Sequence, residues 1–158
     1  MAAGTRDVRS YSTAAASLGN SFVVTKDLDM ADVVTVKGSA IENGEVAQLI
    51  DIKKGTFVHG VSLEVLDAGA GTTLTCAVGD GSSTAGFVAA SDAKAAVGTV
   101  YGPAQITLSE GTPNTYVPAY AGGKLYDADD TLDVLIGYNT VSKLAKVRVT
   151  AICSRVKA

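Results

Sequence analysis

Few side chains in this sequence could carry out acid–base or nucleophilic chemistry. His59 is the only histidine among the 158 residues. A catalytic histidine needs a nucleophile or an acid beside it, and a metal-binding histidine needs further ligands. The residues around His59 supply neither, and the sequence has no Gly-x-Ser-x-Gly turn. We therefore predict that His59 is a packing residue in the core or at an interface, and that the protein is not an enzyme.

Two acidic stretches resemble ligand sites. Gly79-Asp80-Gly81 follows an apolar strand, as a phosphate-binding loop does, but the Gly-Lys-Ser/Thr of a Walker motif is missing. We interpret it as a turn. Asp127, Asp129 and Asp130 offer the oxygen ligands that calcium prefers, without the spacing or the closing glutamate of an EF-hand. We favour a solvated turn at a strand entry, and we expect no metal and no cofactor.

The two cysteines, Cys76 and Cys153, are too few for a disulfide framework. Each lies at a position that the alternation of its strand directs inward, so we predict buried free thiols. A disulfide between them is the alternative, because the sequence does not give the distance between their Cα atoms.

Tyrosines are the residues best suited to recognise a partner. They could form a sugar-binding face or a protein interface, and the absence of tryptophan favours the interface. Tyr116 and Tyr120 are expected to be exposed, since they lie beside Pro113 and Pro118. With residues of the N-terminal segment they make up the candidate interface: Arg6, Arg9, Tyr11, Tyr116 and Tyr120.

Composition narrows the classes of function. Hydrophobic residues make up 47% of the chain and charged residues 18%, which favours a folded domain over a disordered chain. The net charge of −3 disfavours nucleic acid as a direct partner. Residues 1–20 lack the apolar core of a signal peptide, and no apolar run approaches the ~18 residues of a membrane span. We expect a protein made in a cytoplasm, without a membrane partner.

Alternation of apolar and polar residues is clearest in residues 46–81, around which the rest of the chain is expected to be organised. In residues 57–65 the odd positions are predicted to face the core. Residues 131–138 and 145–154 alternate in the same way, and we predict that they pair as a hairpin through the link at 139–144. Shorter strands are expected at 21–25, 33–36, 46–52, 72–78, 99–101, 105–108 and 124–126. The predicted inward set of the central strand is Phe57, His59, Val61, Leu63 and Val65.

The segments between these strands are short, except for residues 82–97, which are expected to form a loop that crosses between the sheets. Residues 26–32 are expected to be a charged connection, and Ser91 is expected to cap one helical turn at 92–97. Many short strands separated by Gly-rich turns predict an all-β fold, an antiparallel β-sandwich of the jelly-roll type. We assign residues 21–158 to this single domain. Residues 1–20 are predicted to be a flexible polar arm, either disordered or ordered against a neighbouring subunit.

One long stretch resembles a known family. The residues that carry the resemblance are 49–65, with Gly55-Thr56 leading into a valine-rich strand, then 72–81, Phe87 and Val97-Gly98-Thr99. They are similar to a recurring segment of tailed-bacteriophage virion proteins, although Lys53-Lys54-Gly55 replaces an entry that contains proline. The resemblance implies a capsid decoration, or cement, protein on the capsid surface of the virion. It implies a homotrimer that binds the major capsid protein and stabilises the icosahedral head. The alternative is a head-fibre or tail-associated module that recognises host-surface glycan.

Overall fold

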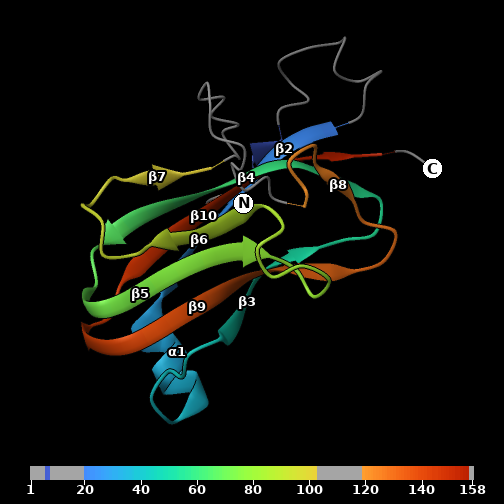
Figure 1. Ribbon diagram of the computed structural model, residues 1–158. Coiled ribbons are helices and arrows are strands. Elements are labelled where there is room, and N and C mark those ends of the chain that lie inside the picture. Colours follow the sequence, from blue (N-terminus) through green and yellow to red (C-terminus); the bar gives the residue numbers. More distant parts are fainter. Residues whose placement is uncertain (1–5, 8–19, 103–118, 157–158) are drawn as a thin grey trace, which may run out of the picture.

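The protein is an all-β sandwich, as the strand pattern predicts. The computed structural model describes residues 6–7, 20–102 and 119–156. Its strands form two antiparallel sheets that stack as two layers (Figure 1). Sheet A has the order β1-β2-β10-β4-β7, with β8 also paired to β4, and sheet B has the order β3-β9-β5-β6. The strands are β1 (Arg6–Asp7), β2 (Asn20–Asp29), β3 (Glu45–Ile52), β4 (Thr56–Asp67), β5 (Ala70–Gly79), β6 (Val88–Asp92), β7 (Val100–Tyr101), β8 (Lys124–Leu125), β9 (Asp130–Lys143) and β10 (Lys146–Arg155).

The hydrophobic core lies between the two sheets. Alternate side chains of β4, β5, β9 and β10 point into it, and most of them are fully buried. Cys76 and Cys153 belong to this core as free thiols, which confirms the prediction. Burial raises the pKa of Cys76 to about 12 and that of Cys153 to about 11, so neither thiol is reactive near neutral pH.

A β-bulge reverses the inward face of β4. Cys153 lies opposite Val58 and Ile152 lies opposite Gly60, so that His59 is an extra residue on β4. The prediction for residues 57 and 59 is therefore wrong: Phe57 is half-buried and His59 is exposed on the outer face. The remaining odd positions, from Val61 onward, are buried as predicted.

A register shift in β3 also changes which residues face the core. The register shifts between Gln48 and Ile50, so Leu49 interrupts the alternation. Ile50 and Ile52 are buried, whereas Val46, on the other side of the shift, is 42% exposed.

The helix of the structure lies where strands and a charged connection were predicted. Residues 20–29 all belong to β2, and α1 (Met30–Lys37) follows directly. The Asp29 side chain accepts a hydrogen bond from Ala31 N at 2.9 Å, and Gly38 ends the helix at φ 74°. The stabilisation by caps at both ends therefore outweighs the low helix propensity of the β-branched residues 33–36. Conversely, Asp92 ends β6 and no helix forms at 92–97, where the chain turns and reaches Gly98 at φ 87°.

The predicted C-terminal hairpin is also wrong, although both of its strands exist. β9 pairs with β3 and β5 in sheet B, and β10 pairs with β2 and β4 in sheet A. The chain crosses between the sheets at residues 144–145. A strand with one apolar face can pair with any partner that shares its burial, so alternation alone does not identify neighbours.

β7 and β8 behave as two parts of one interrupted edge strand. Tyr101 lies opposite Leu63, and Leu125 lies opposite Phe57. Six residues of β4 thus correspond to 24 residues of the other segment, which is 18 more than a continuous strand needs. The predicted strand at 105–108 lies within this excess and outside the described residues.

Candidate functional site

Two of the five predicted interface residues, Arg6 and Tyr120, lie in the part of the chain that the structure describes. Arg6 belongs to β1, which pairs with Phe22 and Val23 of β2. Tyr120 is half-buried, and its hydroxyl group donates a hydrogen bond to Asp80 at 3.1 Å. Arg9, Tyr11 and Tyr116 lie outside the described residues, and their role stays a prediction.

The most elaborate polar arrangement surrounds Asp80, in the turn that follows β5. The Asp80 side chain has no exposed surface. Its Oδ1 accepts hydrogen bonds from Ser82 N at 2.9 Å, Ser83 N at 3.0 Å and Tyr120 at 3.1 Å. Its Oδ2 accepts from Lys124 Nζ at 2.6 Å and from the Tyr126 hydroxyl at 2.7 Å. We call Asp80, Tyr120, Lys124 and Tyr126 the Asp80 cluster.

The Asp80 cluster joins the two sheets. Asp80 directly follows β5 of sheet B, whereas Lys124 belongs to β8 of sheet A. Tyr120 N also donates to Gly86 O at 2.7 Å, and the Tyr120 ring lies 5.0 Å from that of Phe87. The cluster therefore fixes the chain where it returns toward β8.

Electrostatics hold Asp80 and Lys124 as an ion pair. Burial works to raise the pKa of Asp80, but the hydrogen bonds from Lys124, Tyr126 and the two backbone N–H groups outweigh it and lower that pKa. Burial works to lower the pKa of Lys124, and the bond to Asp80 outweighs it and raises that pKa. The ammonium also lies 4.5 Å from the Tyr120 ring centroid and 4.7 Å from that of Tyr126.

Two glycines allow the chain to fold tightly around this cluster. A Cβ at Gly79 would lie 1.8 Å from Ser83 O, and a Cβ at Gly86 would lie 2.3 Å from the Tyr120 ring. Neither position has room for a side chain, so the turn requires glycine there. The predicted turn at 79–81 is confirmed, and the buried carboxylate inside it is a feature that the sequence pattern did not reveal.

A second carboxyl group is buried beside the first. Asp133 of β9 lies opposite Gly79, is only 5% exposed and accepts a hydrogen bond from Thr131 Oγ1 at 2.6 Å. Burial, and to a lesser degree the negative charges of Asp130 and Asp80, raise the pKa of Asp133.

Replacing Asp133 with asparagine is expected to raise the melting temperature at pH 7. Because the pKa is raised in the folded state, stability falls as the pH rises and the folded protein loses this proton. The amide keeps an acceptor for Thr131 and carries no charge. Below about pH 4 the carboxyl group is protonated in both states, so the gain should shrink there. Thermal unfolding at pH 7 and pH 3, with the exposed Asp51→Asn as control, checks this; an equal gain at both pH values would contradict it.

The outer face of sheet A has a polar half and an apolar half. In the polar half, Arg148 pairs with Asp27 through two hydrogen bonds of 2.8 and 3.2 Å, and Thr25 bonds Thr150 at 3.3 Å. In the apolar half, Val23 lies opposite Ile152, and these side chains are 37% and 52% exposed. The polar half thus satisfies its own groups, whereas the apolar half exposes aliphatic surface.

His59 lies next to this apolar half, against a serine. Its Nε2 atom is 2.8 Å from Ser154 Oγ, and its ring lies 4.8 Å from that of Phe57 in an edge-on contact. A Ser–His pair is part of many nucleophilic sites, but Ser154 is only 8% exposed, and among the described residues no carboxylate hydrogen bonds to the His59 ring. We therefore interpret the pair as a structural hydrogen bond that links the extra residue of the β4 bulge to β10.

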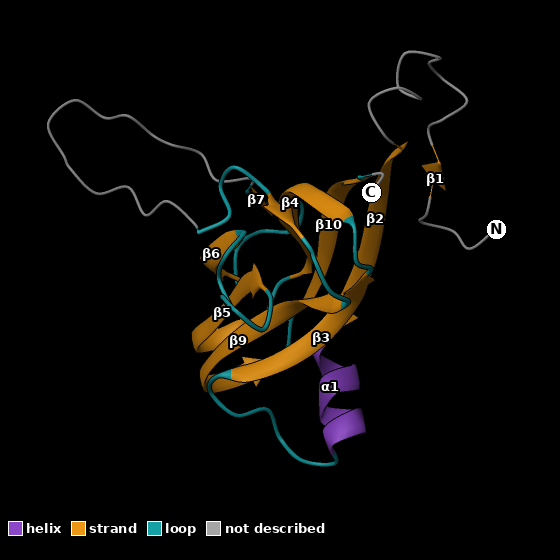
Figure 2. Ribbon diagram, turned by 90° about the vertical axis from the view of Figure 1, so that its right-hand side faces the viewer, coloured by secondary structure: helices purple, strands orange, loops and turns teal. Residues whose placement is uncertain are grey.

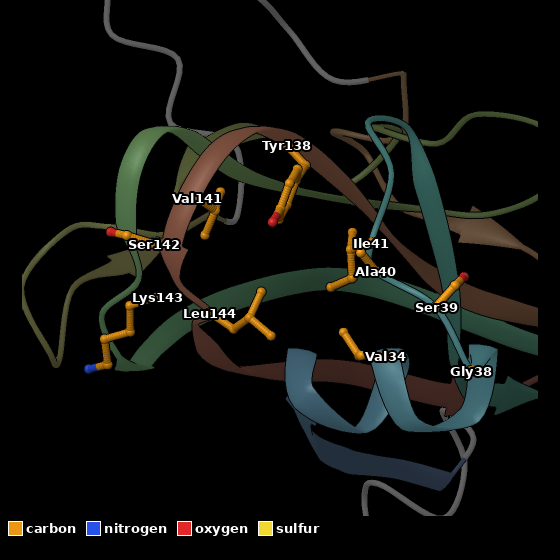
Figure 3. Close-up of a pocket in the computed structure, with 10 residues that line it drawn as sticks. All are labelled: Val34, Gly38, Ser39, Ala40, Ile41, Tyr138, Val141, Ser142, Lys143 and Leu144. Carbon is orange, nitrogen blue, oxygen red and sulfur yellow. The ribbon is translucent and has the colours of Figure 1, made fainter.

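A groove of about 330 Å³ lies between α1 and the end of β9. Figure 2 shows α1 at one end of the sandwich, and Figure 3 shows the side chains that line the groove. The lining is mainly aliphatic, with Val34 on α1 facing Val141 and Leu144. Lys143, the charged residue among the described residues that line the groove, is paired with Asp67 at 2.6 Å and does not serve a polar ligand there.

The predicted acidic turn pairs with lysine. Asp129 accepts hydrogen bonds from Lys53 Nζ at 3.0 Å and from Lys54 N at 2.9 Å. Across residues 6–7, 20–102 and 119–156, no three histidine, cysteine or acidic side chains are grouped so that they could hold a metal ion. In the same ranges no helix has the length and apolar character needed to cross a membrane.

Comparison with known proteins gives a likeness of fold. The sequence matches no model of a known protein family and no curated protein. The structure is similar to a chain of the solved structure "Cyanophage Pam1 capsid asymmetric unit", with a TM-score of 0.57 and 18% sequence identity. The likeness covers 87% of this chain and 86% of that chain.

Proposed function

We propose that this protein is a structural component of a bacteriophage virion, a capsid decoration or cement protein that binds and stabilises the icosahedral head. The observation that carries the proposal is the likeness to a chain of a cyanophage capsid asymmetric unit over 87% of this chain. The resemblance to virion proteins of residues 49–65, 72–81, Phe87 and 97–99 supports it from an independent direction. In this role the protein is non-enzymatic, resides in the virion and acts through surfaces.

The strand order supports a jelly-roll topology. Strands β2, β10 and β4, with the interrupted strand β7/β8, form one sheet, and β3, β9, β5 and β6 form the other. Successive strands β2, β3, β4 and β5 alternate between the sheets. Such double-sheet folds recur in capsid proteins.

The proposed partners are two further copies of this chain, in a homotrimer, and the major capsid protein. Binding energy would come from a composite interface, because such interfaces draw on buried apolar anchors rather than on one polar site. The exposed apolar half of sheet A, around Ile152, supports association of this kind. Residues 1–20 would act as an arm that orders on a neighbour.

The glycan-binding alternative receives less support. Tyr120 donates its hydroxyl group to Asp80 and packs its ring near Phe87 and Lys124. A tyrosine face for sugar would therefore depend on Tyr116.

Shell binding tests the proposal directly. Capsid shells of the encoding phage, prepared without this protein, are mixed with the purified chain, and occupancy is measured by cosedimentation. We expect saturable binding, a loss of at least tenfold in affinity for Ile152→Asp, and little change for Val36→Asp, which alters a 90% exposed valine on α1. Absence of binding by the unaltered chain would overturn the proposal.

Deleting residues 1–20 tests the arm separately. The deletion also removes β1 and the first residue of β2, which lie at the edge of sheet A. We expect the shortened chain to keep the two stacked sheets and to bind shells at least tenfold more weakly, because it loses the contacts of the ordered arm. Circular dichroism checks the fold and cosedimentation checks the binding. Unchanged occupancy would remove the arm from the interface, and a stable monomer in sedimentation equilibrium would overturn the homotrimer.

A further inference from the structure

The Asp80 cluster places a primary amine against a carboxyl group in an enclosed, aromatic-lined site. Lys124 Nζ lies 2.6 Å from Asp80 Oδ2, and the Asp80 side chain has no exposed surface. We propose that Lys124 and Asp80 condense to an intramolecular isopeptide bond that joins β8 of sheet A to the end of β5 in sheet B. This inference does not depend on the proposed function.

The two carboxyl oxygens of Asp80 are held for different roles in such a reaction. When the amine attacks Cγ, negative charge develops on the oxygen that stays in the product. Oδ1 faces three donors at 2.9 to 3.1 Å, two of them backbone N–H groups of consecutive residues, Ser82 and Ser83. The two backbone donors form an Asx turn around Asp80, and in the proposed reaction all three donors would hold the charge that develops on Oδ1.

Oδ2 is placed to leave as water. It accepts hydrogen bonds from Lys124 Nζ and from the Tyr126 hydroxyl, at 2.6 and 2.7 Å. The C–N bond forms as the C–Oδ2 bond breaks. One proton of the ammonium group passes to Oδ2 along the 2.6 Å hydrogen bond and leaves an amine whose lone pair attacks Cγ, and a second proton follows as the bond to Oδ2 breaks. The Tyr126 hydroxyl stays hydrogen-bonded to the leaving oxygen. Ammonium and carboxylate thus become one amide and one water molecule, with atoms and charge in balance and no oxidant required.

The surroundings hold the two groups in contact and limit the access of water. The rings of Tyr120 and Tyr126 lie 4.5 and 4.7 Å from Nζ and shield the pair from solvent, although Lys124 keeps 22% of its side-chain surface exposed. Two groups held in contact react with effective molarities that reach roughly 10⁵–10⁸ M in well-oriented cases. The water that is released leaves toward the exposed side of Lys124, and the enclosed amide is protected from hydrolysis.

A covalent bond at this place would tie the sandwich together mechanically. It would close a loop between positions 80 and 124, and it would link the two sheets beside the point where the chain returns to β8. A cross-link of this kind restricts the unfolded chain as a disulfide does, and it needs no oxidising compartment.

Mass spectrometry of the denatured, full-length protein tests the proposal. We expect the chain to be lighter than its sequence by one water molecule, and a protease digest to contain a branched peptide that joins Lys124 to Asp80. Asp80→Asn should form the same bond with loss of ammonia. Tyr126→Phe should accumulate the cross-link more slowly after refolding.

Lys124→Arg is the matched control, because it keeps the cation and cannot form this amide. The control matters because Asp80-Gly81 could also lose water by forming a succinimide, which would persist in Lys124→Arg and would give no branched peptide. The proposal is overturned if the unaltered chain, held folded at neutral pH for several days, keeps the full mass of its sequence. It is equally overturned if the lighter form occurs to the same extent in Lys124→Arg.

Discussion

In the chain whose Asp80 and Lys124 form an ion pair and not a cross-link, Asp80→Ala is expected to lower the free energy of unfolding by about 3–5 kcal/mol, the range seen when one partner of a buried ion pair is removed. The substitution leaves Lys124 with only 22% of its side chain exposed and no counter-ion. It also deprives the Tyr126 hydroxyl, which is almost fully enclosed, of its acceptor. Each buried donor left without a partner adds its own desolvation cost.

Urea unfolding followed by circular dichroism measures this effect. The matched control is Asp127→Ala, which removes an exposed carboxyl group near β8 and should change stability by no more than about 0.5 kcal/mol. A loss below about 1 kcal/mol for Asp80→Ala would mean that the pair behaves as an ordinary surface salt bridge, and it would contradict the role of the Asp80 cluster in holding the sheets together.

Gly79→Ala is expected to destabilise the protein by about 3 kcal/mol, at the upper end of the cost of overpacking. A Cβ there would lie 1.8 Å from Ser83 O and 2.5 Å from Thr84 C, which are backbone atoms and not the ends of flexible side chains. To make room, residues 83–84 would have to move away from Asp80. That movement would break the 2.9 Å bond from Asp80 N to Ser83 O and the 3.0 Å bond from Ser83 N to Asp80 Oδ1.

Gly81→Ala provides the control for this prediction, two residues away in the same turn. A Cβ at Gly81 would meet no atom within 4 Å. The substitution should be neutral or stabilising by up to about 1 kcal/mol, because alanine restricts the unfolded chain more than glycine does. Chemical unfolding of the two variants side by side measures the difference. Equal stability of Gly79→Ala and Gly81→Ala would show that the turn can relax without loss.

Fold class was accessible from the sequence because it depends on local patterns. Alternation in residues 61–65, 132–138 and 145–153 appears in the structure as buried faces. The errors come from single residues. The bulge at His59 moves Phe57 and His59 outward, and the caps at Asp29 and Gly38 convert residues 30–37 into a helix.

Which strands pair with each other could not be predicted from local sequence patterns. β9 and β10 follow each other closely and both have one apolar face, yet they lie in different sheets. Pairing depends on contacts with β2, β3, β4 and β5, which are distant in sequence. Local alternation states that a face is buried and does not state which strand lies beside it.

The candidate site shows the same division most clearly. By itself the sequence determined a sandwich of short strands, two buried thiols, a single histidine without catalytic partners, and a turn at 79–81. Only the tertiary structure decided that this turn encloses a carboxylate, because its partners Tyr120, Lys124 and Tyr126 are 40 to 46 positions away. Hydrogen bonds between such distant residues leave no periodic signal in the chain. They form only when the two sheets pack and bring the end of β5 against β8.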